Sequence, residues 1–78
     1  MRHSMFEDIS SAIITTVIDE WVRGRHAERN RCILKDRLLL GRTFENLAEN
    51  YDMSVRQIKN IVYKYEAIIC DKIEASKV

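Results

Sequence analysis

The absence of proline is the feature that most constrains the fold of this chain. Its 78 residues include no proline and only two glycines, Gly24 and Gly41. Proline breaks helices and glycine favours turns, so this composition suits long helices interrupted at two places. It argues against a turn-rich β fold. We therefore expect an all-α protein, and a chain of this length has room for one domain only.

Apolar residues recur along the chain at spacings of three and four, which is typical of helices with one buried face. The pattern predicts four helices near residues 5–23, 27–40, 44–50 and 54–73. The two glycines lie at the expected ends of the first two helices, where glycine readily adopts a left-handed conformation. In the second helix the expected core positions are Ile33, Leu34 and Leu38.

Residues 1–24 are expected to form an amphipathic helix with a wide apolar face. Ser4 and Glu7 have the spacing of a capping box, in which each side chain satisfies a free backbone amide at the helix start. The recurring apolar positions are Phe6, Ile9, Ile13, Val17 and Trp21. A face this wide needs cover, so the helix should pack on the rest of the domain or at a dimer interface.

The charge of the chain is small in total but unevenly placed. The formal net charge is +1. Residues 23–42 carry seven Lys and Arg against Glu28 and Asp36, and residues 54–65 carry three basic side chains and no acid. A nearly neutral protein with such segments can present a basic face to a polyanion. For residues 23–42, phosphate contact and a simply solvated helix surface both remain open.

Cysteine and histidine give no sign of a metal site. Cys32 and Cys70 lie far apart, and with His3 and His26 they show no metal-ligand spacing, so we expect neither a metal nor a cofactor. No secretion signal is recognisable, and the apolar stretch 13–18 is too short and polar to cross a bilayer. We expect a cytoplasmic protein that does not bind membranes, with both cysteines as free, buried thiols.

The segment from Thr43 to Tyr65 carries the clearest local signals. Thr43 is a typical N-cap for the short third helix, and Asp52 is a residue that tolerates the left-handed conformation of a tight turn. Ser54 and Gln57 then form a second capping box at the start of the fourth helix. Two capped helices joined by a three-residue turn are typical of a helix-turn-helix.

The packing pattern of the same segment also fits a helix-turn-helix. The two helices of this motif cross steeply, so a small residue is needed at their crossing, with apolar residues at fixed offsets around it. Ala48 occupies the small position. The apolar positions are occupied by Leu47, Tyr51, Met53, Ile58 and Ile61. Met53 and Ile58 also have the spacing of a hydrophobic staple. We therefore predict a helix-turn-helix over residues 43–65.

The outer face of the fourth helix is basic and polar. Helical spacing places Arg56, Lys59, Asn60 and Tyr63 opposite the apolar face, with Lys64 at the edge. Arginine can pair with guanine through two hydrogen bonds and asparagine with adenine, while lysine neutralises phosphates. Tyr63 fits either a contact with DNA or an ordinary half-exposed surface position. We interpret Gln57 as the cap partner of Ser54 rather than as a base reader.

The run from Arg31 to Lys59 resembles region 4 of bacterial sigma factors, the helical domain that reads the −35 promoter element in the major groove. The likeness covers residues 28 to 66, and its most specific part is Thr43-Phe-Glu-Asn-Leu-Ala-Glu49, followed by Asp-Met-Ser and a basic helix. It implies base reading by Val55, Arg56 and Asn60, and a phosphate contact by Lys59. At Val55 the family often has a polar residue, although an apolar side chain can touch a thymine methyl group.

These observations predict a small stand-alone protein with a region 4-like fold that binds specific double-stranded DNA and regulates transcription. The alternative is a protein-interaction module that binds RNA polymerase, or a sigma or anti-sigma partner, without reading DNA. No side chains form a catalytic constellation, so we do not expect an enzyme. We also expect a homodimer, formed through the first helix or through the tail around Ile69 and Ile73.

Overall fold

A computed structural model of the chain describes residues 10–76, and this part consists of four helices and no strand. The helices are α1 (Ser11–Trp21), α2 (Ala27–Leu38), α3 (Phe44–Asn50) and α4 (Val55–Ser76). The expectation of an all-α fold with four helices is confirmed.

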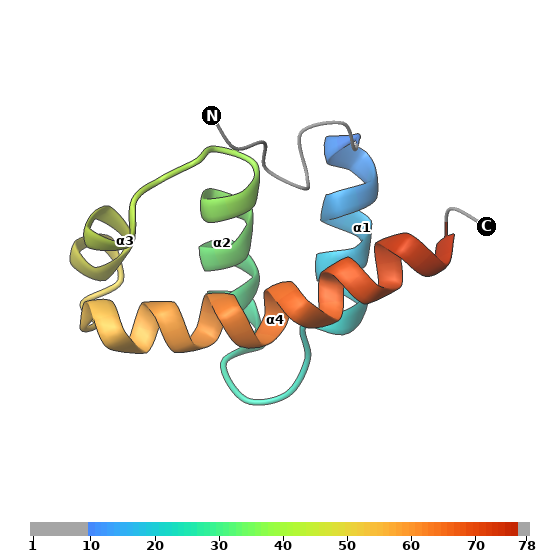
Figure 1. The fold of residues 1–78 in the computed structure, drawn as a ribbon. Coiled ribbons are helices and arrows are strands. Elements are labelled where there is room, and N and C mark those ends of the chain that lie inside the picture. The colour runs from blue at the N-terminus through green and yellow to red at the C-terminus, as the bar shows by residue number, and fades with distance from the viewer. Residues whose placement is uncertain (1–9, 77–78) are drawn as a thin grey trace.

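The long helix α4 organises the other three. It has 22 residues and is therefore about 33 Å long. Figure 1 shows α4 running across α2 and α1, with α3 beside its N-terminal end and α1 beside its C-terminal half. α2 also packs on both α1 and α3. One side of α4 is thus packed against the other helices along most of its length, and the opposite side is exposed.

One apolar core lies between α4 and the other helices. Its buried side chains are Ile14, Val17, Ile18, Val22, Ile33, Leu34, Leu47, Ile58, Val62, Ile69 and Ile73. Burying one such side chain fully contributes about 1.5–3 kcal/mol. Four of these residues come from α4, and they extend from its first turn almost to its end. The fourth helix, expected near residues 54–73, thus keeps an apolar side through Ile69 and Ile73.

Helix α1 begins later than the sequence pattern predicts. It starts at Ser11, because Ser10 has an extended backbone and its hydroxyl accepts a hydrogen bond from the amide of Ala12 at 3.2 Å. Serine competes for backbone amides in this way, which favours a helix start at this position. The predicted capping box of Ser4 and Glu7 lies outside the described residues, as do Phe6 and Ile9.

The buried face of α1 is rotated relative to the predicted one. Its core residues are Ile14, Val17, Ile18 and Val22, whereas Ile13 and Trp21, which the pattern placed on the apolar stripe, are each 47% exposed. The apolar residues cover too wide an arc for α2 and α4 to bury all of it. Trp21 lies at the rim, with the ammonium group of Lys72 4.3 Å from its ring centre.

The two glycines occupy the predicted breaks in the helical pattern. Gly24 has φ +96° and Gly41 has φ +68°, so both need the left-handed region that glycine tolerates best. The helices themselves stop slightly earlier than expected, α1 at Trp21 and α2 at Leu38. Backbone groups within the turns then close the connections, as when the amide of Arg42 donates to the carbonyl of Asp36.

In α2 the buried residues agree only in part with expectation. Ile33 and Leu34 are fully buried, Leu38 is half-buried, and Asn30 joins the buried side. Cys32 is exposed, so the expectation of a buried thiol is wrong at this position. Asn30, Ile33 and Leu34 share the buried side of α2. Helical spacing places Cys32 on a different side of the helix, which faces solvent. Cys70 is half-buried, and neither cysteine forms a disulfide.

Candidate nucleic-acid interface

The link between α3 and α4 is built from local hydrogen bonds. Thr43 caps α3, since its hydroxyl accepts from the amide of Asn46 at 3.0 Å. Asp52 has φ +54°, the left-handed turn conformation expected from the sequence. The amide of Met53 donates to the carbonyl of Ala48 at 2.9 Å, which closes the turn.

The start of α4 is capped in both directions. The amide of Gln57 donates to Ser54 Oγ at 3.1 Å, and the amide of Ser54 donates to Gln57 Oε1 at 2.9 Å. These are the two bonds of a capping box. The interpretation of Gln57 as the cap partner of Ser54 is confirmed. Its Oε1 is therefore engaged at the helix start.

The inner face of this helix pair is packed around Ala48. Leu47 of α3 and Ile58 of α4 are fully buried. Around them lie partly buried residues that contact the core, including Ala48, Tyr51, Met53 and Ile61. These are the same positions that the sequence pattern selected. Packing and capping together fix the direction in which the opposite side of α4 faces.

Three of the predicted DNA-contacting residues form a row on that opposite side. Arg56, Asn60 and Lys64 are all exposed, and their spacing of four residues places them along one face of α4. Val55 begins the helix and is half-buried. The side chains of Arg56 and Asn60 make no hydrogen bond with any residue that the structure describes. Their side-chain donors and acceptors are therefore available to a ligand.

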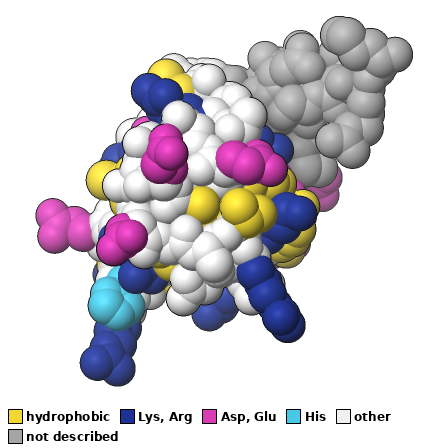
Figure 2. Space-filling view, turned by 90° about the vertical axis from the view of Figure 1, so that its left-hand side faces the viewer, with side chains coloured by type: hydrophobic (Ala, Val, Ile, Leu, Met, Phe, Trp, Pro, Cys, Tyr) yellow, Lys and Arg dark blue, Asp and Glu magenta, His cyan; other side chains and the backbone are white. Residues whose placement is uncertain are grey.

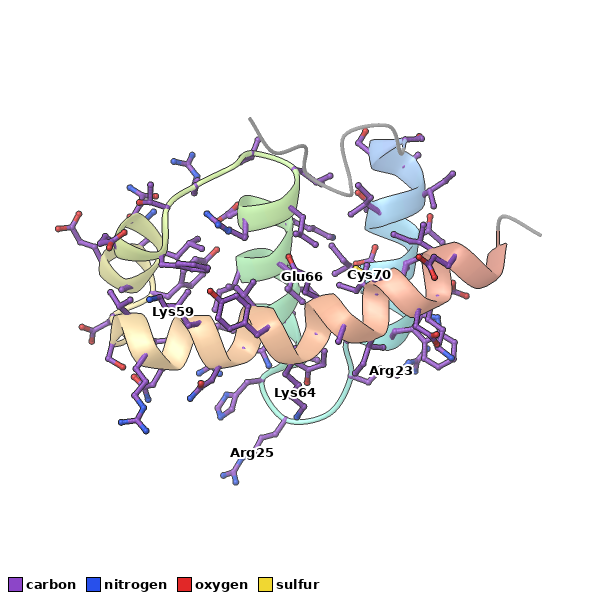
Figure 3. All side chains as sticks on the ribbon, in the orientation of Figure 1. Arg23, Arg25, Lys59, Lys64, Glu66 and Cys70 are labelled. Carbon is purple, nitrogen blue, oxygen red and sulfur yellow. The ribbon has the colours of Figure 1, made fainter. Side chains whose placement is uncertain are left out.

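The other two predicted residues, Lys59 and Tyr63, lie toward α3 instead. The ring of Tyr63 meets that of Phe44 edge-on, with centroids 5.8 Å apart and planes at 79°. The ammonium group of Lys59 lies 5.7 Å from the centre of the same Phe44 ring. Figure 3 shows Lys59 and Lys64 extending from opposite edges of α4. Tyr63 remains 55% exposed, but its ring is already engaged in packing α4 on α3.

The sequence pattern did not identify the cluster around Phe44. The guanidinium carbon of Arg37, from α2, lies 4.2 Å from the Phe44 ring centre, and its Nη1 donates to the carbonyl of Arg42 at 2.8 Å. Arg37, Phe44, Lys59 and Tyr63 thus join three helices beside the outer face of α4. An aromatic residue directly after an N-cap, with basic residues in the neighbouring helices, is the only hint of this cluster in the sequence.

Most basic residues of segment 23–42 have partners within the protein. Arg31 Nε donates to the carbonyl of Val22 at 2.8 Å, and Lys35 Nζ forms an ion pair with Asp19 at 2.9 Å. Arg23 Nε donates to the carbonyl of Glu20. These contacts tie α1 to α2 or cap the end of α1. Arg23, Arg31 and Lys35 therefore have a structural role, which explains their charge without a phosphate contact.

The charge that remains exposed is not evenly distributed. Figure 2 views the molecule from the α3 side, and the lowest side chains on this face are Lys, Arg and His. The Asp and Glu side chains visible in this view lie above them. The described surface therefore has a basic lower margin, which includes the side of α4 from which Lys64 projects (Figure 3).

Two groups near α4 have shifted pKa values. The hydroxyl of Tyr51 donates to Asp36 Oδ2 at 2.8 Å, and burial together with this hydrogen bond raises the pKa of Tyr51 from 10.0 to about 12. Burial, followed by the charges of Glu66 and Glu74, raises the pKa of Cys70. Glu66 and Cys70 lie on the edge of α4 away from Lys64 (Figure 3). Both shifts favour the neutral form, and neither activates a nucleophile.

Other kinds of site find little support among the described residues. Within residues 10–76, no three His, Cys, Asp or Glu side chains are grouped so that they could hold a metal ion. The helices in this part of the chain are also too short or too polar to span a membrane.

Comparison with family models, curated proteins and solved structures finds no match for this chain.

Proposed function

We propose that this protein binds specific sequences of double-stranded DNA and regulates transcription, with α3 and α4 acting as a helix-turn-helix. One observation carries this proposal. Arg56 and Asn60 are exposed one turn apart on the outer side of a helix whose start is capped and whose inner side is anchored. Side chains that read bases need such rigid support, because a small displacement removes their hydrogen bonds.

In this proposal the N-terminal half of α4 enters the major groove. Arg56 then donates two hydrogen bonds to a guanine, and Asn60 pairs with an adenine. Lys59 and Lys64 neutralise phosphates on either side of the helix, and Val55 meets a thymine methyl group. Residues 55–65 contain no acid that would repel the DNA. The sequence resemblance to sigma region 4 supports the same assignment of residues.

A cytoplasmic location is part of the proposal, because a transcription regulator acts there.

The proposal also includes a homodimer. A single module of this size buries only about 600–1,000 Å² on DNA, so one copy would bind weakly. Two copies on half-sites about one helical turn apart would bind more tightly. We therefore keep a homodimer as part of the proposal, with the exposed Ile13 and Trp21 of α1 as the candidate contact; the alternative contact through Ile69 and Ile73 is wrong, because both side chains are buried in the core. Light scattering that finds only monomer across the accessible concentrations would exclude this part.

The same exposed residues favour a second candidate function. Ile13 and Trp21 are large apolar side chains on one helix, and exposed apolar residues of this kind often mark contacts with other proteins. A protein-interaction module would use them to bind RNA polymerase or a sigma or anti-sigma protein. Such a complex would depend little on salt, whereas binding to DNA weakens steeply as salt increases.

The decisive experiment is selection of bound duplexes from random DNA with the purified protein, followed by titrations at several salt concentrations. We expect an enriched sequence motif and an affinity that falls linearly, on logarithmic scales, with salt. No binding to any duplex at low salt would exclude DNA recognition. A salt-insensitive complex with polymerase would then make the interaction module the better proposal.

A further inference from the structure

The connection between α1 and α2 presents an exposed arginine that has no hydrogen-bond or ion-pair partner among residues 10–76. Figure 1 shows this connection below α4, whereas the α2–α3 connection lies at the top of the molecule in the same view. Gly24 has φ +96° and His26 has φ +61°, so two left-handed residues turn the chain sharply here. Arg25 lies between them. It is exposed, and it makes no hydrogen bond or ion pair with the described residues.

Arg25 differs in this respect from its basic neighbours. Arg23 donates to the carbonyl of Glu20, Arg29 donates to Asn30 Oδ1 at 3.1 Å, and Arg31 donates to the carbonyl of Val22. Because no described residue bonds to its side chain, Arg25 has five donors that can bind a ligand. The nearest acid in sequence is Glu28, a single residue against four arginines in segment 23–31.

The side from which Arg25 projects is also the side of the proposed DNA-binding row. Figure 3 shows Arg25 and Lys64 extending downward from the molecule together. Lys64 lies one turn after Asn60 and two turns after Arg56 on the same face of α4. The α1–α2 connection therefore adds Arg25 to the basic side chains that project from the lower side of the molecule near Lys64.

We propose that Arg25 binds a phosphate of the DNA backbone next to the groove that α4 enters. This inference rests on the proposed DNA-binding function. Guanidinium groups bind phosphate through two parallel hydrogen bonds, and they do so without reading sequence. With α4 in the groove, the contact lies on the flank near Lys64. It gives the protein a second anchor that fixes the direction of α4 along the groove and lengthens its footprint.

The test compares Arg25→Ala with Arg42→Ala. Both replacements remove one positive charge from an exposed loop residue, but Arg42 lies in the α2–α3 connection at the opposite edge. Binding is measured by fluorescence anisotropy on the selected duplex with long flanks, at several salt concentrations. We expect Arg25→Ala to weaken binding about three- to tenfold and to lower the slope of log affinity against log salt by about 0.9. Arg42→Ala should stay within about twofold of wild type.

Two further measurements separate a phosphate contact from other causes. Arg25→Lys keeps the charge and should keep the wild-type salt slope. Shortening the duplex on the flank near Lys64 should abolish the difference between wild type and Arg25→Ala, while the base preference stays the same for both. Thermal melting should show equal stability for wild type, Arg25→Ala and Arg25→Lys, because the Arg25 side chain is exposed and forms no hydrogen bond or ion pair with the described residues.

The outcomes distinguish this inference from the function on which it rests. If wild type binds no duplex, the proposed function fails and the inference fails with it. If wild type binds but Arg25→Ala binds the long duplex equally well, only the inference is wrong. It is also wrong if Arg25→Ala and Arg42→Ala weaken binding equally, because that result reports overall charge. A changed salt slope in Arg25→Lys, or a difference that persists on the shortened duplex, would overturn it as well.

Discussion

Phe44 and Tyr63 meet edge to face, so the first residue of α3 and the third turn of α4 are fixed relative to each other. This contact lies beside the proposed recognition surface rather than in the core. It joins the start of α3 to α4 on the side that also carries Lys59. The angle between α3 and α4 therefore depends on the contact between Phe44 and Tyr63.

A double-mutant cycle measures this contact. Phe44→Leu, Tyr63→Leu and the double variant should give a coupling free energy of about 0.5–1.5 kcal/mol in denaturant unfolding, the usual range for aromatic pairs. The matched control pairs Phe44→Leu with Tyr65→Leu, since Tyr65 contacts the core and the ammonium group of Lys64. That pair should be additive. A coupling near zero between Phe44 and Tyr63 would contradict the edge-on contact.

The hydrogen bond between Tyr51 and Asp36 predicts a second effect on stability. Tyr51→Phe removes a donor to a carboxylate and should lower the free energy of unfolding by about 1–2 kcal/mol. Tyr63→Phe is the control, because it removes a hydroxyl from an exposed ring and should change stability by less than about 0.5 kcal/mol. Equal stability of Tyr51→Phe and wild type would show that α3 does not depend on this bond.

The same tyrosine predicts how stability responds to alkaline pH. Folding raises the pKa of Tyr51 from 10.0 to about 12, so the folded state favours the protonated phenol. The resulting stabilisation is complete below pH 10 and is lost as the pH rises from 10 through 12. The stability difference between wild type and Tyr51→Phe should therefore be constant below pH 9 and shrink above pH 10. A difference that grows in this range would have the wrong sign.

Ala48 provides a test of the helix crossing. It is half-buried against the core, and its carbonyl accepts the turn-closing bond from Met53. Ala48→Leu forces extra volume between α3 and α4 and should lower the free energy of unfolding by about 1–3 kcal/mol. Ala67→Leu, the same substitution at an exposed position of α4, should stay within about 0.5 kcal/mol. If both variants unfold like wild type, the crossing is not at Ala48.

The features that could be predicted from the sequence are those decided within a few residues. The cap of Thr43, the reciprocal bonds of Ser54 and Gln57, and the left-handed Asp52 all depend on neighbours no more than three positions away. Each of these residue types has a specific reason to occupy its position, so a single sequence contains the information. The positions of the breaks at Gly24 and Gly41 follow in the same way.

The features that the sequence did not predict depend on distant contacts. The apolar arc of α1 is wider than its partners can cover, and only the packing against α2 and α4 decides that Val22 is buried and Trp21 exposed. Helical spacing placed Lys59 and Tyr63 on the open side of α4, but it takes no account of Phe44 reaching across from α3. The bond from Tyr51 to Asp36 joins residues fifteen positions apart.

The residues of the outer row should affect sequence preference. Asn60→Ala and Arg56→Ala each remove a side chain proposed to contact base edges, so each should lose about 1–3 kcal/mol on the selected duplex and relax the preference at one base pair. Binding to a scrambled duplex should change much less, because that binding depends on phosphates. Titrations of both duplexes with each variant measure the difference. Equal losses on both duplexes would reassign these residues to the backbone.

Lys59 should behave in the opposite way, and its position explains why. Its ammonium group lies near the Phe44 ring on the α3 side of the helix, away from the row that ends at Lys64. In the proposed complex, a lysine at this position would contact a phosphate at the edge of the groove and not the base edges at its floor. Lys59→Ala should therefore weaken the selected and scrambled duplexes by similar factors and lower the salt slope by about one unit. Val55→Ala is the contrasting variant, since a lost contact with a thymine methyl group weakens only those duplexes that carry the thymine. If Lys59→Ala changed the preferred sequence while the salt slope stayed constant, the lysine would read bases, and the assignment of the two edges of α4 would have to be reversed.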